Sequence, residues 1–172
     1  MEPVPSDTDC VVRSLSEPKA FELIFERHFG VIFRYLRRRC GAAAEDLAAE
    51  TFTRAFAGRA GYDVARGDAR PWLFGIATNV LRAHHRDLVV PGVLGERAEE
   101  IEADARLDAV TALARVTDAL RALPTGQREV LLLVAVAELT YEETAEALGV
   151  PVGTVRSRMA RARAALNPVE VR

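Results

Sequence analysis

Residues 140–166 read TYEETAEALGVPVGTVRSRMARARAAL, and this stretch decides the fold of the C-terminal part of the chain. Thr140 and Glu143 have the spacing of a capping box, in which a hydroxyl and a carboxylate each satisfy a backbone amide at a helix start. Gly149 supplies the left-handed backbone that a tight turn requires. The spacing therefore predicts a helix over about 141–148, a turn at Gly149 and a second helix that continues to the end of the stretch.

The second predicted helix has an apolar face and a basic face. Apolar side chains recur on one side at helical spacing: Val155, Met159, Ala162 and Leu166. The other side carries Thr154, Arg156, Ser157, Arg158, Arg161 and Arg163. Ala145 is small where the two helices must cross closely. These features are typical of a helix-turn-helix whose second helix enters the major groove of DNA. The alternative is an ordinary helical hairpin whose arginines face solvent.

Three further helices are predicted upstream from the same periodicity. The first begins near Phe21 and ends at Gly41, after a basic turn of arginines at 37–39. The second covers about 45–59, and the third begins at Pro71, which suits a first helical turn. These segments predict a helical N-terminal unit.

The third of these helices presents polar side chains beside a glycine-rich loop at 58–68. Its outward residues are Asn79, Arg82, His85 and Arg86, and Tyr62 lies in the loop. Such a basic face can hold a nucleic-acid backbone while an unstacked base enters a pocket. A solvated polar face is the alternative.

Charge is distributed unevenly along the 172 residues, of which 49% are hydrophobic. The 23 basic and 25 acidic residues give a net charge of -2, which alone argues against a nucleic-acid partner. Residues 151–172, however, hold five arginines and one acidic residue, whereas residues 91–120 hold three arginines and seven acidic residues. A proline and two glycines open the acidic stretch, which predicts a linker over 91–109. No strand-like alternation occurs, so we expect an all-α chain of two small helical domains joined by an acidic linker.

Composition excludes several other classes of protein. Cys10 and Cys40 are too few for a disulfide scaffold or a zinc site and indicate free thiols. The longest wholly apolar run, 130–137, is far shorter than the roughly 20 residues that span a bilayer. The N-terminus is acidic where a signal peptide would be basic. We expect a soluble cytoplasmic protein without membrane insertion, and a loose leader over residues 1–17.

Signatures of enzyme chemistry are missing from the sequence. It has neither a glycine-rich phosphate cradle nor a Gly-x-Ser-x-Gly nucleophile turn. His28 lies on an apolar face and predicts a core histidine, whereas the adjacent His84 and His85 point to different sides of their helix. We therefore expect no catalytic residue, no metal site, no cofactor and no enzymatic activity.

Four motifs occur in an order that resembles the extracytoplasmic-function (ECF) sigma factors. They are AEDLAAETFTRAF (44–56), RPWLFGIATNVLRAHHR (70–86), ALRALPTGQREVLLL (119–133) and the helix-turn-helix. The resemblance covers roughly residues 18–167. It implies a sigma-2 domain over 18–90, which binds core RNA polymerase and recognises and melts the -10 element. It also implies a sigma-4 domain over 110–167, which reads the -35 element, so the chain would direct promoter-specific transcription initiation.

The resemblance implies roles for individual residues. The family's clamp-binding helix falls on Asp46, Leu47, Glu50, Thr51 and Arg54, with Ala49 where a glutamine is common. Its -10-reading part falls on Tyr62, Asp63, Asn79, Arg82 and Arg86, and the loop 62–69 resembles a pocket for a flipped base. Its -35-reading part falls on Arg156, Ser157, Ala160 and Arg161, with Thr154 and Arg158 nearer the DNA backbone.

The resemblance also implies partners: core RNA polymerase, through its large-subunit clamp and flap, promoter DNA and an anti-sigma factor. The acidic linker resembles the segment that threads the RNA exit channel, and polymerase would bring the protein to the nucleoid. Two other classes stay open from the residues alone. One is a stand-alone helix-turn-helix regulator that binds a palindromic site as a dimer, and the other is a pure interaction protein.

Overall fold

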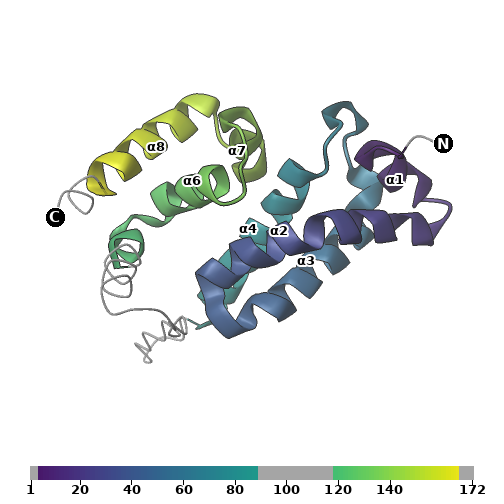
Figure 1. The fold of residues 1–172 in the computed structure, drawn as a ribbon, viewed down its shortest axis with the longest axis horizontal. Coiled ribbons are helices and arrows are strands. Elements are labelled where there is room, and N and C mark those ends of the chain that lie inside the picture. The colour runs from purple at the N-terminus through teal and green to yellow at the C-terminus, as the bar shows by residue number, and fades with distance from the viewer. Residues whose placement is uncertain (1–3, 89–117, 167–172) are drawn as a thin grey trace. The chain divides into compact units, whose positions relative to one another are not determined.

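The computed structural model describes residues 4–88 and 118–166, and within these ranges every regular element is a helix. The chain divides into two compact units, whose helices are labelled in Figure 1. The N-terminal unit is built from α1 (Asp7–Arg13), α2 (Glu22–Cys40), α3 (Ala44–Gly58) and α4 (Arg70–Leu88), and the C-terminal unit from α6 (Thr125–Ala135), α7 (Tyr141–Leu148) and α8 (Val152–Leu166). The predicted all-α class is confirmed. The predicted linker lies outside the described residues.

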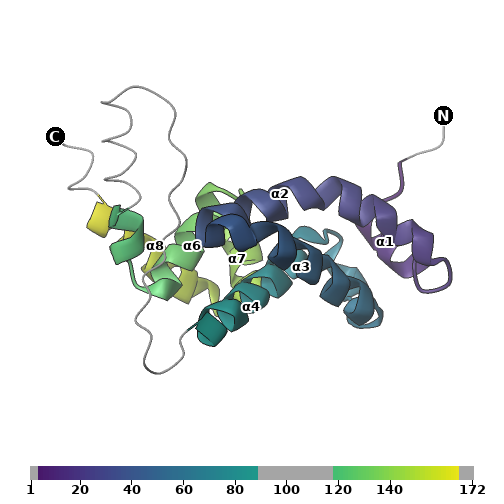
Figure 2. The same cartoon turned by 90° about the horizontal axis from the view of Figure 1, so that it is seen from below.

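Helices α2, α3 and α4 lie side by side, as Figures 1 and 2 both show, and their apolar residues are buried between them. Their completely buried residues include Ile24, Ile32, Tyr35, Leu36, Ala48, Ala55, Leu73, Phe74, Ala77 and Leu81. The hydroxyl oxygens of Tyr35 and Thr78 lie 3.2 Å apart inside this core, so two buried polar groups satisfy each other. The Tyr35 ring also meets Phe74 edge to face, with ring centroids 5.3 Å apart.

The ends of the three long helices follow from local chemistry. Helix α2 ends at Cys40, just before Gly41, as the sequence predicts. Gly41 has a φ of 54°, a backbone conformation that residues with a side chain rarely adopt. Helices α3 and α4 each begin one residue before the predicted start. The loop that joins them contains two short 3-10 turns, Arg59–Gly61 and Val64–Arg66. This loop includes the segment predicted to read a base.

Helix α1 corrects the prediction of a loose leader at the N-terminus. Ser6 and Asp9 form a capping box: the Ser6 hydroxyl accepts from the Asp9 amide at 3.1 Å, and the Ser6 amide donates to Asp9 Oδ2 at 3.0 Å. Cys10 and Val11 are 2% and 1% exposed. A helix of seven residues is too short to show a periodic pattern in the sequence. Its stability comes from its cap and from tertiary contacts with α2.

The C-terminal unit has its own core around α6. Val130, Leu133, Val155 and Ala162 are completely buried, and Leu132 and Met159 are nearly so. The sequence over 127–138 is apolar nearly all round and predicts a central buried helix, which α6 confirms, but one of the buried residues is Glu129, which is 1% exposed and which the apolar pattern does not predict. An amphipathic pattern also predicts a helix over 110–123; residues 118–122 are helical, and residues 110–117 lie outside the described residues.

Two expectations about single residues agree with the structure. Cys10 and Cys40 are both free thiols. His28 is 7% exposed and packs in the N-terminal unit, as a core histidine should.

Within residues 4–88 and 118–166, no helix is both long enough and apolar enough to cross a bilayer.

Two substitutions on α2 should lower the free energy of unfolding by unequal amounts, because one removes a buried side chain and the other a partly exposed one. Leu36 is completely buried, so Leu36→Ala should lower the free energy of unfolding by about 2–5 kcal/mol. Leu23 is 37% exposed, and Leu23→Ala should cost below about 1 kcal/mol. Urea unfolding followed by the fluorescence of Trp72, the single tryptophan, reports on this unit. Equal costs would contradict the assigned core.

Candidate nucleic-acid interface

Helix α7 and the turn after it form as the sequence predicts. The Thr140 amide donates to Glu143 Oε2 at 2.6 Å, and the Glu143 amide donates to Thr140 Oγ1 at 3.1 Å, which completes the capping box. Gly149 has a φ of 63°, which places the turn in the left-handed region. This turn sets the direction of α8 relative to α7, and α8 starts three residues after Gly149.

Helix α8 buries one face and exposes the other. The buried residues are Val155, Met159 and Ala162, as predicted. The exposed ones include Arg156, Ser157, Ala160, Arg161 and Arg163, and Thr154 is half-buried near the helix start. Four of the six residues predicted to read the -35 element therefore share an exposed, largely basic surface. Such a helix face suits a DNA major groove, because guanidinium groups donate in pairs to guanine and also bind phosphate.

Two arginines of α8 already have neighbours within the C-terminal unit. The Arg158 guanidinium lies against Gly126, where an added Cβ would be only 3.1 Å from Arg158 Cζ. Arg158 is therefore half-buried at the start of α6. Arg156 Nη2 lies 3.9 Å from Glu142 Oε1, and both side chains are 68% exposed. An exposed ion pair this long is weak, so Arg156 stays available to a ligand.

The predicted -10-reading residues divide into exposed and packed groups. Asn79 and Arg86 are exposed on α4, and Arg82 is half-buried. Asp63 is exposed, and its carboxylate accepts from the Ala65 amide at 3.1 Å, which caps a 3-10 turn. These residues lie on α4 and on the loop that precedes it.

Tyr62 differs from the other predicted -10-reading residues because it is only 7% exposed. Its ring lies against Trp72 of α4, with centroids 5.1 Å apart. Burial raises the pKa of the Tyr62 hydroxyl. The loop therefore holds this ring against α4, and a stacking role requires the ring to move.

The residues predicted to bind the polymerase clamp all lie on α3, but two of them face inward. Leu47 and Thr51 are 5% and 0% exposed, and Thr51 Oγ1 donates to the Leu47 carbonyl at 2.7 Å. Asp46, Glu50 and Arg54 are exposed, and Arg54 pairs with Glu50 one turn away. The three charged residues of this set are therefore all exposed, and the two buried ones fix the orientation of α3.

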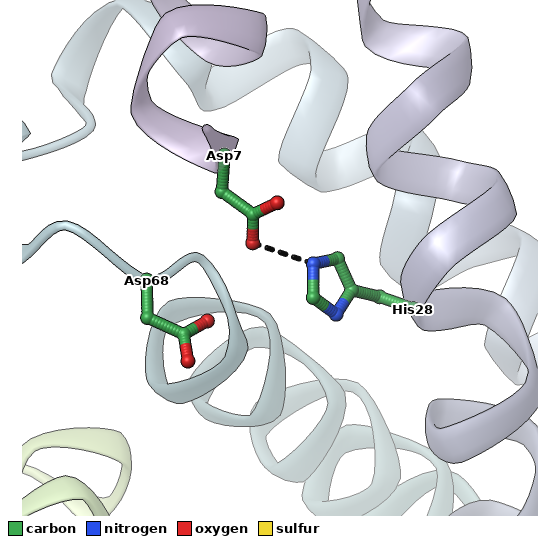
Figure 3. Close-up of side chains that lie close together, drawn as sticks. All are labelled: Asp7, His28 and Asp68. Carbon is green, nitrogen blue, oxygen red and sulfur yellow. Dashed lines mark hydrogen bonds and ion pairs between the residues drawn. The ribbon is translucent and has the colours of Figure 1, made fainter. Parts of the chain in front are cut away.

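A cluster around Asp7 is absent from the sequence-based predictions. Asp7 Oδ1 accepts from Arg27 Nη1 at 2.9 Å, and Asp7 Oδ2 lies 2.6 Å from His28 Nε2. The Ala69 amide also donates to Asp7 Oδ2, at 3.3 Å. Figure 3 shows how Asp7 and His28 meet close to Asp68. The only local sequence signal is the spacing of Ser6 and Asp9, which marks the helix start but not its contacts.

The Asp7 contacts shift its acidity. Burial by itself raises the pKa of a carboxyl group, but hydrogen bonds from His28 and Arg27, the charge of His28 and the Ala69 amide outweigh it. Together they hold the pKa of Asp7 at about 2, below the ordinary value of 3.8. Asp7 is therefore ionised throughout the neutral range.

Two family models match the two units. Residues 24–89 match the one described as "Sigma-70 region 2", and residues 113–166 match "Sigma-70, region 4". The ECF RNA polymerase sigma factor SigC of Mycobacterium tuberculosis is 41% identical over 127 residues, which cover 72% of this chain and 68% of that protein. The ECF RNA polymerase sigma factor SigW of Bacillus subtilis is 34% identical over 164 residues, which cover 86% and 87% of the two chains.

Two solved structures have similar folds. CnrH, in complex with the cytosolic domain of CnrY, superposes with a TM-score of 0.73 at 28% identity, and the match covers 96% of this chain and 97% of that one. The sigma factor RpoE from Bartonella quintana, in complex with the anti-sigma factor NepR, also gives a TM-score of 0.73, at 26% identity over 88% of this chain and 96% of that one.

The lowered pKa of Asp7 predicts an acid-dependent contribution to stability. Ionised Asp7 stabilises the fold above its ordinary pKa of 3.8, and this contribution is lost as the pH falls toward the folded pKa of about 2. Asp7→Asn should therefore cost about 2 kcal/mol near neutral pH and progressively less below about pH 4. Urea unfolding followed by Trp72 fluorescence at several pH values measures the difference. A difference that does not change with pH would refute the assigned pKa.

Proposed function

The chain belongs to the ECF group of the sigma-70 family of RNA polymerase sigma factors, and we propose that its two units divide the recognition of one promoter between them. As an alternative sigma factor, it directs promoter-specific transcription initiation. We assign residues 18–90 to the sigma-2 domain and 110–167 to the sigma-4 domain. The family matches at 24–89 and 113–166 support this division.

The exposed face of α8 is the observation that carries the proposal, and we assign it to the -35 element. Arg156, Ser157 and Arg161 project from this face toward base edges, and the small Ala160 leaves room for a thymine methyl group. Thr154 and the packed Arg158 contact the DNA backbone. Base contacts by the exposed arginines supply sequence discrimination, and the backbone contacts fix the register of the helix.

The N-terminal unit recognises and melts the -10 element in this proposal. Asn79, Arg82 and Arg86 share one side of α4, the helix that directly follows the loop carrying Tyr62 and Asp63. The basic groups hold the phosphate backbone, and Asn79 donates and accepts at the edge of an unstacked base. The support is that Asn79 and Arg86 are exposed on the helix that follows a loop with a buried aromatic ring.

The exposed acidic groups Asp46 and Glu50 of α3 are assigned to the basic large-subunit clamp of core RNA polymerase, with Arg54 beside them. Leu47 and Thr51 position these groups from the core. The sigma-4 domain is assigned to the polymerase flap, and the acidic linker to the RNA exit channel. Because polymerase works in the cytoplasm, on the nucleoid, the protein acts there.

An anti-sigma factor is the regulatory partner in this proposal. The support is that RpoE of Bartonella quintana, whose chain is covered to 96% by its match with this one, is described in complex with the anti-sigma factor NepR. The activity assigned here is binding and positioning, and it requires no catalytic residue, metal or cofactor of this chain.

Association with core polymerase tests the proposal against a stand-alone regulator. Purified protein should co-elute with core polymerase at a ratio of one to one and should run alone as a monomer. It should not form a dimer on palindromic DNA. A dimer that binds a palindrome and does not bind core polymerase would establish the regulator instead.

Base recognition by α8 predicts a sequence-dependent loss for Arg161→Ala. Initiation from promoters with the preferred -35 element should fall by the equivalent of about 1–3 kcal/mol, and promoters with scrambled -35 elements should respond less. Run-off transcription with the reconstituted holoenzyme measures both. Arg163→Ala, which removes an exposed charge outside the assigned set, is the control. An equal loss on every -35 sequence would indicate a phosphate contact instead.

The acidic face of α3 predicts that charge reversal weakens binding to polymerase. Asp46→Lys combined with Glu50→Lys should lower the affinity for core polymerase at least about tenfold, because two attractive contacts become repulsive. Fluorescence titration against core polymerase measures the affinity, and circular dichroism checks that the helices remain.

The matched control for this reversal is Glu22→Lys with Glu26→Lys. Both residues are exposed on α2, and Glu22, like Asp46, lies in the first turn of its helix, so the effect on the helix dipole is similar. Unchanged affinity in the α3 variant, or an equal loss in the α2 control, would remove Asp46 and Glu50 from the interface.

A further inference from the structure

The first turn of α1 contacts two segments that are distant in the sequence. Asp7 accepts hydrogen bonds from Arg27 and lies 2.6 Å from His28, both on α2, and it also accepts from the amide of Ala69 at the end of the loop before α4. Figure 3 shows Asp7 reaching from α1 toward His28, with the loop residue Asp68 close by. One carboxylate therefore links three segments of the unit.

The neighbouring Thr8 makes a second contact with the same loop. Its hydroxyl donates to the carbonyl of Gly67 at 3.2 Å. Gly67 has a φ of 75° and ends the 3-10 turn Val64–Arg66, so the loop has a positive-φ backbone at this contact. Asp68 then accepts from the Arg70 amide at 2.8 Å, which starts α4. The α1 contacts thus fix the loop at the point where it turns into α4.

The cluster of Asp7, His28 and Asp68 also resembles a set of metal ligands, since one possible ligand atom from each lies within 4.8 Å of the others. Both oxygens of Asp7 already accept hydrogen bonds, and one of them pairs with the Arg27 guanidinium. A fixed positive charge at this place disfavours a cation. The contacts therefore favour a role in holding the loop.

We propose that the first turn of α1 is a clasp that positions the base-reading loop 62–69, with Asp7 and Thr8 as its positioning residues. This inference rests on the proposed function of that loop at the -10 element. A loop that is ordered before DNA binds loses less conformational entropy when it captures a base. The clasp should therefore favour promoter opening without contacting DNA or polymerase.

Amide hydrogen exchange in the full-length protein tests the clasp directly. Thr8→Val should accelerate exchange at loop amides, including Ala69, about tenfold, because it removes the hydrogen bond to the Gly67 carbonyl, and amides of α3 should keep their exchange rates. Asp7→Asn should accelerate the loop amides more than those of α3, which exchange faster only because this variant also lowers the free energy of unfolding. Thr8→Ser, which keeps the hydroxyl, should restore the protection, and Glu17→Gln, which removes an exposed carboxylate paired with Arg13, is the control.

Two exchange results would overturn the inference. Loop amides that exchange at the wild-type rate in both variants would show that the contacts do not order the loop. Acceleration in Thr8→Val that is equal in the loop and in α2, α3 and α4 would show that these contacts serve general stability only.

Promoter opening by the reconstituted holoenzyme tests the functional part. On duplex promoters, Asp7→Asn and Thr8→Val should slow open-complex formation about tenfold while the affinity for core polymerase is unchanged. Opening at the wild-type rate with a loosened loop would overturn the inference and leave the proposed function intact. If the wild-type holoenzyme opened no promoter, the proposed function would fail and the inference with it.

Discussion

Val155 is completely buried in the C-terminal unit, and its burial fixes which side of α8 faces outward. Met159 and Ala162 follow at helical spacing and extend the same buried face. With this side inward, Arg156 and Arg161, which lie on the other side of the helix, are exposed. In the proposed function, recognition of DNA by this unit therefore depends on an apolar contact inside the protein.

The N-terminal unit obeys the same constraint. Leu47 and Thr51 turn one side of α3 into the core, and that burial presents Asp46 and Glu50 to the outside. The loop 62–69, which we propose reads the -10 element, buries Tyr62 and Ala69 but exposes most of its other residues. Its placement therefore depends on polar contacts as well, among them those of Asp7, which joins Arg27 of α2 to the Ala69 amide. Apolar packing orients the helices, and hydrogen bonds add to the packing that orients the loop.

The features that sequence predicted well are those that local chemistry decides. The capping box at Thr140, the turn at Gly149 and the two faces of α8 each depend on residues a few positions apart. Three features escaped prediction because they depend on distant residues. Helix α1 is stabilised by contacts such as that of Asp7 with Ala69, which is 62 positions away. Tyr62 is buried against Trp72 of α4, and Glu129 is buried in the largely apolar core of the C-terminal unit.

The net charge of -2 gives the free chain little general attraction to DNA, so polymerase has to supply much of the electrostatic binding. In the proposed function, both units read one promoter while polymerase holds them. Sequencing the transcript starts that the reconstituted holoenzyme makes on a randomised promoter library tests this claim most directly. We predict starts that share two sequence elements, near -35 and -10, at a constant spacing. Starts that match those of core polymerase alone, or that share no second element, would contradict it.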